Sequence, residues 1–367
     1  MPEALWSERR NKMSRFCSDK YSSLTPYVPG EQPGNMSEFI KLNTNESPFP
    51  PSQKAIEYAL NSTRALNLYS DPDSLELTKT IASLYGVGKD MVLVTNGSDE
   101  ILNFAFMAFT DSINPALFAD ITYGFYPVFA SLNGSKTEII PLRDDFTLSV
   151  DDYIGKKGTV FIANPNAPTG ITVPVSEIER LVKSDPDRVV VIDEAYVDFG
   201  GESAVELVHK YDNILICQTF SKSRSFAGGR LGYGIGSPQL ISDLNTVKYS
   251  TNPYNINSMT SSMGIGILKD EEYTRKNCRT IMKNRSFTVK ELEKLGFRVL
   301  PSNANFIFVS SPEIEGGEYY RRLKEKKILV RHFDKERIAP WCRVSIGTRE
   351  QMEIYLEATK EILEEKP

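Results

Sequence analysis

Residues 218–233 read QTFSKSRSFAGGRLGY and place a lysine, Lys222, directly behind a hydroxyl residue. A lysine amine in such a position can form a Schiff base with an aldehyde cofactor. Thr219, Ser221 and Arg230 add two hydroxyl groups and a guanidinium group, which can hold the phosphate of that cofactor. The stretch therefore predicts Lys222 as the catalytic residue of a pyridoxal 5'-phosphate (PLP) site.

A second stretch, VVVIDEAY at residues 189–196, predicts the groups that face the cofactor ring. Its run of β-branched residues indicates a buried strand, and Asp193 stands at the end of that strand. Burying a carboxylate is costly unless it gains a cationic partner, and a protonated pyridine nitrogen is such a partner. Tyr196 can donate a hydrogen bond to the ring hydroxyl group.

The surrounding pattern predicts an α/β fold. From about residue 52, short apolar strands alternate with helices, which indicates a mostly parallel sheet covered on both faces. In such sheets, ligands bind beyond the carboxyl ends of the strands. The predicted strands include residues 91–95, 116–118, 160–163, 189–192, 214–217 and 231–235.

The loop NGSDE at residues 96–100 lies at one of these carboxyl ends and opens a predicted helix at 99–109. Gly97 permits close approach of the backbone, and Ser98 and Asp99 are common N-cap residues. A helix N-terminus offers free N–H groups to a phosphate. These residues are candidate phosphate contacts, although the motif alone also fits an ordinary helix cap.

Two further loops offer groups for the cofactor ring. Tyr123 is predicted to begin a helix at 123–132, where its ring can stack on that of the cofactor. The turn NPNAPTG at residues 164–170 is rigid and can aim the amide of Asn166 at the ring.

After residue 270 the pattern changes to an α+β arrangement that suits a smaller domain. We expect a large PLP-binding domain at 46–268 and a small domain at 269–367. Residues 1–45 are expected to join the small domain through a strand near residue 40. Residues 1–20 are predicted to form a charged arm.

Composition excludes several classes of function. The chain has 367 residues, a net charge of −5 and no dense basic tract, which argues against nucleic acid as a partner. No apolar run is long enough to span a membrane, and residues 1–20 lack the apolar core of a signal peptide. The four cysteines are widely spaced and there are two histidines, so we expect free thiols, no metal site and a cytoplasmic location.

Together these motifs resemble the fold-type I PLP-dependent aminotransferases of class I and II, and most of all the histidinol-phosphate aminotransferase family. The resemblance implies a large domain with a mostly parallel, seven-stranded sheet and a smaller α+β domain. It extends over nearly the whole chain. The motifs that carry it are LTPY at 24–27, LNTNESP at 42–48, DEAYVDF at 193–199, SK at 221–222, AGGRLG at 227–232 and RVSIGTRE at 343–350.

The resemblance also implies roles for single residues. Tyr69 would reach the cofactor phosphate of the partner subunit, so the active form would be a homodimer with shared sites. Arg343 would bind the substrate carboxylate, while Arg331 and Tyr27 would grip a substrate phosphate. The substrate-binding residues implied in this way are Tyr27, Asn45, Arg331 and Arg343.

One position departs from the family pattern. Ala167 stands where the family carries an asparagine before Pro-Thr-Gly, so either Asn166 takes over the bond to the ring hydroxyl or Tyr196 supplies it alone. Arg331 and Arg343 are expected to face the site together if the predicted strands at 328–330 and 344–346 pair. Lys222 is expected to have a lowered pKa because of its cationic surroundings.

The activity implied by the resemblance is amino transfer from a phosphorylated donor, histidinol phosphate, to 2-oxoglutarate. Two alternatives stay open at this point, a threonine-phosphate decarboxylase and an aromatic amino acid aminotransferase. Two other classes are disfavoured. The chain has no room for the helix-turn-helix domain of aminotransferase-like regulators, and no G-x-G-x-x-G for a nicotinamide cofactor follows an early strand.

Overall fold

The computed structural model describes residues 14–22 and 24–365. Most of the predicted arm at residues 1–20 therefore lies outside the described residues. Its described part includes a single 3-10 turn at Asp19–Tyr21. Within the described ranges, no helix has both the length and the apolar character needed to cross a bilayer.

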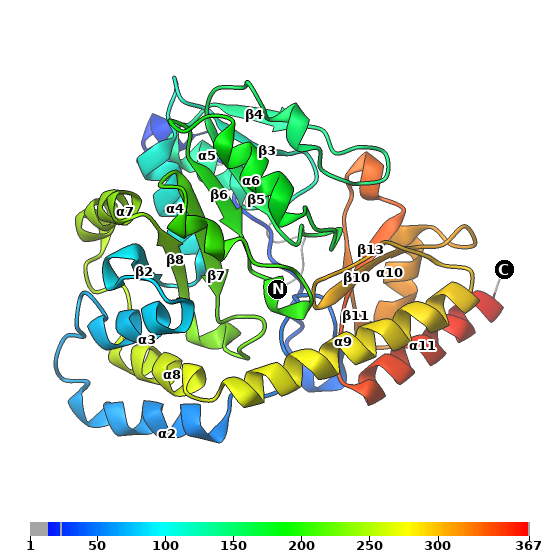
Figure 1. The fold of residues 1–367 in the computed structure, drawn as a ribbon. Helices are drawn as coiled ribbons and strands as arrows, with labels where there is room; N and C mark the ends of the chain where they lie inside the picture. Colours follow the sequence, from blue (N-terminus) through cyan, green and yellow to red (C-terminus); the bar gives the residue numbers. More distant parts are fainter. Residues whose placement is uncertain (1–13, 23, 366–367) are drawn as a thin grey trace.

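A seven-stranded sheet forms the centre of the large part (Figure 1). All neighbouring strands are parallel except β8, which is antiparallel to both β2 and β7. The mostly parallel sheet is thereby confirmed. In spatial order its strands are β2 (Val92–Thr95), β8 (Gly232–Gly236), β7 (Ile214–Thr219), β6 (Val190–Asp193), β5 (Thr159–Ala163), β3 (Ala116–Ala119) and β4 (Thr137–Ile140).

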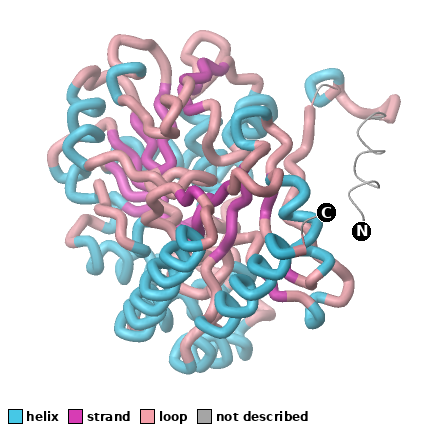
Figure 2. Tube along the Cα trace, turned by 90° about the vertical axis from the view of Figure 1, so that its right-hand side faces the viewer, coloured by secondary structure: helices cyan, strands magenta, loops and turns pink. Residues whose placement is uncertain are grey.

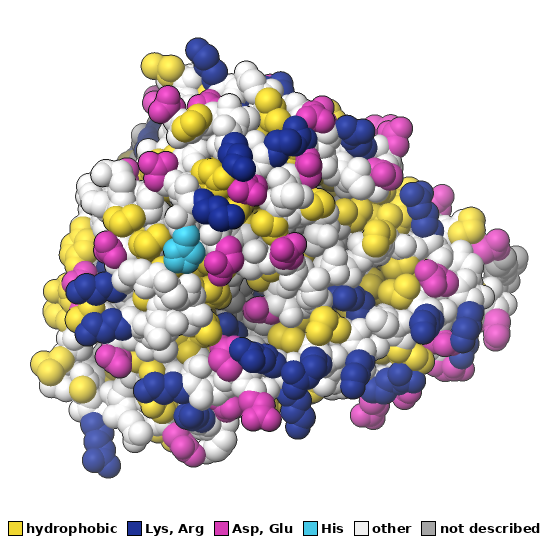
Figure 3. Space-filling view, viewed as in Figure 1, with side chains coloured by type: hydrophobic (Ala, Val, Ile, Leu, Met, Phe, Trp, Pro, Cys, Tyr) yellow, Lys and Arg dark blue, Asp and Glu magenta, His cyan; other side chains and the backbone are white. Residues whose placement is uncertain are grey.

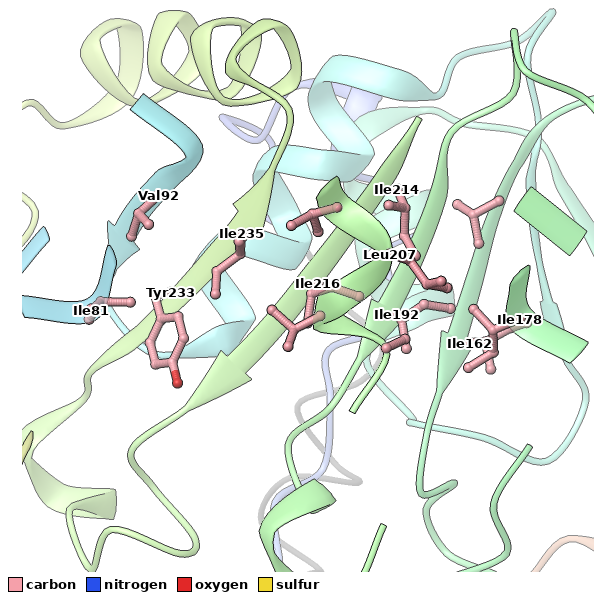
Figure 4. Packing of buried hydrophobic residues seen from close by; sticks show 14 of the residues in the cluster. Ile81, Val92, Ile162, Ile178, Ile192, Leu207, Ile214, Ile216, Tyr233 and Ile235 are labelled. Atoms are coloured by element: carbon pink, nitrogen blue, oxygen red, sulfur yellow. The ribbon is translucent and has the colours of Figure 1, made fainter. Parts of the chain in front are cut away.

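Helices cover both faces of this sheet. Successive residues of a strand point to opposite faces, so the buried strands contribute apolar side chains to a core on each side. In β6, Val190 and Ile192 belong to one buried cluster and Val191 belongs to the other. Figure 4 shows part of the first cluster, where side chains of neighbouring strands lie side by side. This face is covered by α3 (Leu75–Tyr85), α6 (Val175–Lys183) and α8 (Ser258–Leu268), and the other by α4 (Ser98–Phe109), α5 (Tyr126–Asn133) and α7 (Pro238–Thr251).

A smaller α+β part follows the long helix α9 (Glu271–Lys294), which runs from the lower centre of Figure 1 to the right, above α11. Figure 2 shows the molecule from the right-hand side of Figure 1. In this view, helices lie in front of strands. The exposed face of α9 carries many Lys and Arg side chains (Figure 3). The elements of this part are an antiparallel sheet of β12 (Arg331–His332), β13 (Trp341–Ser345), β10 (Phe306–Ser310) and β9 (Arg298–Val299), with α10 (Gly316–Glu325) and α11 (Arg349–Glu364).

The predicted N-terminal strand pairs with this smaller part. β1 (Ile40–Lys41) lies parallel to β11 (Ile328–Leu329), and Leu42 joins the buried cluster of the C-terminal part. That cluster also contains Tyr196 from the large part, so the packing is continuous between the two. The domain boundaries at 45/46 and 268/269 stay predictions.

Some local expectations were wrong. Helix α5 begins at Tyr126 instead of Tyr123, and Pro127 in its first turn suits that start because it donates no backbone hydrogen bond. The strand at 328–330 does not pair with that at 344–346; β11 pairs with β1 instead. The predicted elements also omitted β4, α7, α8 and a helix before the sheet, α2 (Gln53–Ser62).

Candidate active site

Two adjoining cavities open at the carboxyl ends of β5, β6 and β7. One, here the Asp193 cavity, has a volume of about 300 Å³, and the other, the Arg343 cavity, about 390 Å³. Both volumes fall near the lower end of the range of small-molecule sites. The residues common to both linings are Thr44, Tyr123, Ala167, Tyr196 and Lys222.

Asp193 ends strand β6 and lines the Asp193 cavity. It is 5% exposed and accepts hydrogen bonds from the Tyr126 hydroxyl at 3.2 Å and from the Ala195 N–H at 3.2 Å. Burial raises the pKa of Asp193 to about 6, although those two hydrogen bonds act in the opposite direction. A cation beside this carboxylate would relieve the cost of its burial.

Lys222 follows strand β7 and lies between the two cavities. Its Nζ donates a hydrogen bond to the Thr44 carbonyl oxygen at 3.2 Å. The pKa of Lys222 is lowered to about 8, first by burial and then by the charge of Arg343. The predicted direction agrees, but burial is a larger cause than the cationic surroundings. A lysine with this pKa is mostly protonated at pH 7, but its neutral fraction is far larger than that of an ordinary lysine, which suits a general base.

Hydroxyl groups and a guanidinium group gather at one end of the Asp193 cavity. Thr219 Oγ1 donates to Ser221 Oγ at 3.0 Å, and Ser98 opens helix α4 beside them. Arg230 forms an ion pair with Asp99 at 2.9 Å. This donor set and the helix N-terminus together suit a phosphate group.

Gly97 makes the approach of Arg230 to this end of the cavity sterically feasible. Its φ of +78° is a conformation that favours glycine, and a Cβ built on it would lie 2.6 Å from Arg230 Nη2. Gly97 does not itself line either cavity.

Tyr123 lines both cavities, as expected of a ring that flanks the cofactor. Its hydroxyl donates to Asp99 Oδ1 at 2.6 Å. Burial and the neighbouring Asp99 raise the pKa of Tyr123 well above its ordinary value, so the phenol stays protonated.

Tyr196 is positioned by the N-terminal segment. Asn45 Nδ2 donates to the Tyr196 hydroxyl at 3.0 Å, and the Asn45 N–H donates to Ser345 Oγ at 2.8 Å. Asn45 also lines the Arg343 cavity, and its place beside the substrate stays a prediction.

The structure does not bring Asn166 to either cavity. Its amide accepts a hydrogen bond from Thr122 Oγ1 at 2.8 Å and donates to the Ile121 carbonyl and to Thr169 Oγ1, both at 3.0 Å. Ala167 lines both cavities instead. Of the two alternatives for the ring hydroxyl, the arrangement favours Tyr196 acting alone.

Arg331 and Arg343 lie directly opposite each other in the β12–β13 pair. Arg331 donates to the carbonyl oxygens of Val28 at 3.2 Å and Pro29 at 3.3 Å, and Arg343 Nη2 donates to that of Asn43 at 3.0 Å. Arg343 Nε is buried without a hydrogen-bond partner. Both arginines line the Arg343 cavity, through a strand pairing other than the one predicted.

The two remaining tyrosines have different settings. Tyr27 lines the Arg343 cavity and stacks on Phe125, with 4.3 Å between ring centroids. Tyr69 is 84% exposed, stacks on Tyr254 and lines neither cavity.

Several lining residues had no predicted role. Thr44 and Glu46 belong to the quoted LNTNESP motif, whose polar character just after a strand was the available signal. Phe333 and Lys335 come from the loop after β12, where no sequence pattern marked them.

The residues present fit PLP by the chemistry of their donor set. They provide a lysine, a buried carboxylate that lacks a cation, a phenol and an anion cradle in one cavity. The cradle would hold the phosphate, Asp193 the pyridine nitrogen and Tyr196 the ring hydroxyl. Its members are Ser98, Thr219, Ser221 and Arg230.

Comparison with known proteins settles the family. The sequence profile of aminotransferase class I and II matches residues 37–358. The chain belongs to the class I and II aminotransferase family. The histidinol-phosphate aminotransferases of Clostridium botulinum and Brachyspira hyodysenteriae are 43% and 46% identical to it, each over 96% of this chain and 99% of the relative.

A solved structure gives the same result. The crystal structure of the histidinol-phosphate aminotransferase from Clostridium acetobutylicum matches this aminotransferase with a TM-score of 0.82 and 25% identity. The match covers 89% of this chain and 100% of that chain. The predicted fold-type I architecture and family are confirmed, and the chain is a PLP-dependent transaminase.

When bound, PLP supplies an electron sink that stabilises negative charge at the substrate α-carbon. The chain's own groups do the rest. Asp193 would stabilise a proton on the pyridine nitrogen, and the neutral amine of Lys222 would be available to take a proton from the substrate α-carbon. Arg331 and Arg343, which line the Arg343 cavity, would orient anionic groups of the substrate.

Proposed function

We propose that this aminotransferase moves the amino group of histidinol phosphate to 2-oxoglutarate. The observation that carries the proposal is the charge of the Arg343 cavity. Among the described residues that line it, four are cations and none is acidic. The cations are Lys222, Arg331, Lys335 and Arg343.

Such a lining selects substrates with more than one negative charge. A phosphate monoester carries close to two negative charges at neutral pH, and 2-oxoglutarate carries two carboxylates. Arg343 has a buried Nε without a hydrogen-bond partner, and Arg331 pairs with neutral carbonyl oxygens that a charged ligand would outcompete. The names of the relatives that are 43% and 46% identical support the phosphorylated donor.

We further propose that the enzyme is a homodimer in which Tyr69 completes the cofactor site of the other subunit. The side chains around it are unusually apolar for an exposed segment: Leu66 is 49% exposed, Leu68 68% and Tyr69 84%. A second copy of the chain would cover them. We expect the enzyme to work in the cytoplasm, where its cysteines, free thiols in this structure, would stay reduced.

A donor screen tests the proposed substrate. The cofactor-loaded enzyme is mixed with histidinol phosphate, histidinol, phenylalanine, tyrosine or O-phosphothreonine, and the absorbance of the bound cofactor and the release of CO₂ are recorded. Histidinol lacks just the phosphate, so its kcat/KM should be at least about tenfold lower, because each lost charge-assisted hydrogen bond costs about 1.5–3 kcal/mol.

Two outcomes would contradict the proposal. A higher kcat/KM for phenylalanine or tyrosine would indicate an aromatic aminotransferase, and CO₂ release from O-phosphothreonine would indicate a decarboxylase.

A further inference from the structure

The N-terminal segment 41–47 crosses the cofactor site and touches the catalytic lysine. The Thr44 carbonyl oxygen accepts the hydrogen bond from Lys222 Nζ at 3.2 Å. The Thr44 hydroxyl donates to Glu46 Oε2 at 2.7 Å, and Lys41 forms an ion pair with the same oxygen. Glu46 and Lys222 both line the Asp193 cavity.

In this arrangement the Glu46 carboxylate helps to fix the Thr44 carbonyl group. A backbone carbonyl in an irregular segment keeps its direction only if neighbouring groups restrain it. Two restraints act on this peptide group: the Thr44 hydroxyl is held by Glu46, which Lys41 holds in turn from the edge of strand β1, and the Asn45 N–H of the same peptide group donates to Ser345 Oγ at 2.8 Å. The amine of Lys222 is therefore oriented by residues that are nearly 180 positions away in the chain.

We propose that Glu46 is a positioning residue for Lys222. It restrains the Thr44 carbonyl that receives the lysine amine, and it places a negative charge on the cavity wall that faces this amine. The proposal rests on the family's lysine chemistry and is independent of which amino donor the enzyme uses.

The charges around Lys222 define what Glu46 contributes. Burial lowers the pKa of Lys222, and so do the charges of Arg343 and Arg230, whereas Glu46 and Asp99 raise it. Asp193, Tyr123 and Tyr196 also face the cavity.

Glu46 itself stays ionised at neutral pH. Burial would raise its pKa, but hydrogen bonds from Lys41 and Thr44 and the charge of Lys41 bring it below the ordinary value. Loss of the Glu46 charge therefore makes protonation of the Lys222 nitrogen less favourable. Loss of Lys41 leaves that charge uncompensated and has the opposite effect.

The test uses the holoenzyme and reads the protonation state directly. The visible absorbance of the lysine-bound cofactor is titrated against pH in the wild type and in Glu46→Gln, Glu46→Asp, Lys41→Met and Glu38→Gln. Glu38→Gln is the matched control, because Glu38 lies just before this segment and pairs with Lys327 at 3.5 Å but lines neither cavity.

We expect the midpoint of Glu46→Gln to fall by about half a pH unit or more, which is about a threefold change in the protonation equilibrium. The midpoint of Lys41→Met should rise, Glu46→Asp should recover part of the wild-type value, and Glu38→Gln should leave it unchanged. In Glu46→Gln, kcat should fall more than KM changes, since the lysine acts after the substrate has bound.

A charge effect should shift the titration midpoint in opposite directions in Glu46→Gln and Lys41→Met, whereas a loosened segment should shift it in the same direction in both. Equal shifts in the same direction for Glu46→Gln and Lys41→Met would overturn the proposal, and so would a midpoint in Glu46→Gln that matches the control. If Glu46→Gln does not fold, the rise in Lys41→Met and the partial recovery in Glu46→Asp remain decisive, and their absence would refute it.

Discussion

Asp193 and Glu194 are adjacent buried carboxylates with different surroundings. Asp193 lines the cofactor cavity, whereas Glu194 points away from it and accepts hydrogen bonds from Ser203, the Ala204 N–H and Gln218. Burial raises the pKa of Glu194 to about 7 despite these bonds. Glu194 is therefore a suitable control for substitutions of Asp193, because it is an adjacent buried carboxylate that does not line the cavity.

Replacing Asp193 with Asn should slow the first half-reaction by several orders of magnitude, because the pyridine nitrogen loses the charge that keeps it protonated. Cofactor affinity should fall modestly, since the phosphate cradle is intact. Single-turnover absorbance measures both quantities. Glu194→Gln should lower stability and leave the half-reaction rate within a fewfold of the wild type; equal rates in the two variants would remove Asp193 from the site.

The two facing arginines should divide the substrates between them. Arg331→Ala is expected to reduce kcat/KM for a phosphorylated donor about tenfold to a hundredfold, and to affect 2-oxoglutarate much less. Arg343→Ala should weaken 2-oxoglutarate strongly, and Arg343→Lys should not restore it, because lysine cannot form a planar bidentate pair. Kinetics of both half-reactions provide the measurement. Equal losses for both substrates in Arg331→Ala would refute this division.

At the scale of elements, the turn between β2 and α4 depends on one glycine. Gly97→Ala should weaken cofactor binding by at least about tenfold, because its Cβ would displace Arg230 from the phosphate end of the cavity. Gly86→Ala is the matched control: its φ is +65°, yet nothing lies within 4 Å of its Cβ. Both variants should lose stability, and Gly97→Ala alone should lose cofactor in an equilibrium titration.

The strand-end loops were predictable because each follows a short run of buried, mostly apolar residues. The ends of β5, β6 and β7 bring Ala167, Asp193 and Lys222 together, as parallel strands require. The direction of the Asn166 side chain was not predictable, since its hydrogen-bond partner Thr122 comes from a different loop. Local pattern fixes where a strand ends, but not which of two neighbouring side chains turns inward.

Longer-range packing was less accessible still. Thr44 and Glu46 reach Lys222 because β1 pairs with β11, almost 290 residues further along the chain. No spacing within the segment itself encodes that pairing. The same holds for Lys335, whose loop enters the cavity through the β12–β13 pair.

At the scale of the whole molecule, shared sites predict complementation between subunits. Lys222→Ala and Tyr69→Ala each damage the site, but in a mixed dimer both changes should fall in the same one of its two sites. If Tyr69 acts across the interface, one site of every mixed dimer has both native residues. Refolding the two variants together should then recover up to about one quarter of wild-type activity.

Activity no greater than the average of the two variants would show that Tyr69 acts within its own subunit. Each variant refolded alone is the control, and size-exclusion chromatography checks that dimers have formed.

The pairing of β1 with β11 has a consequence for fragments of the chain. A C-terminal piece that starts at α9 would lack β1 and Leu42, so its two-residue strand β11 would expose unpaired backbone and its core would have a gap. Such a piece should be poorly soluble when expressed alone. Adding a peptide that contains residues 36–48 should restore the solubility of this piece. If a surface loop of the intact protein is cut, the resulting N-terminal and C-terminal fragments should stay bound to each other.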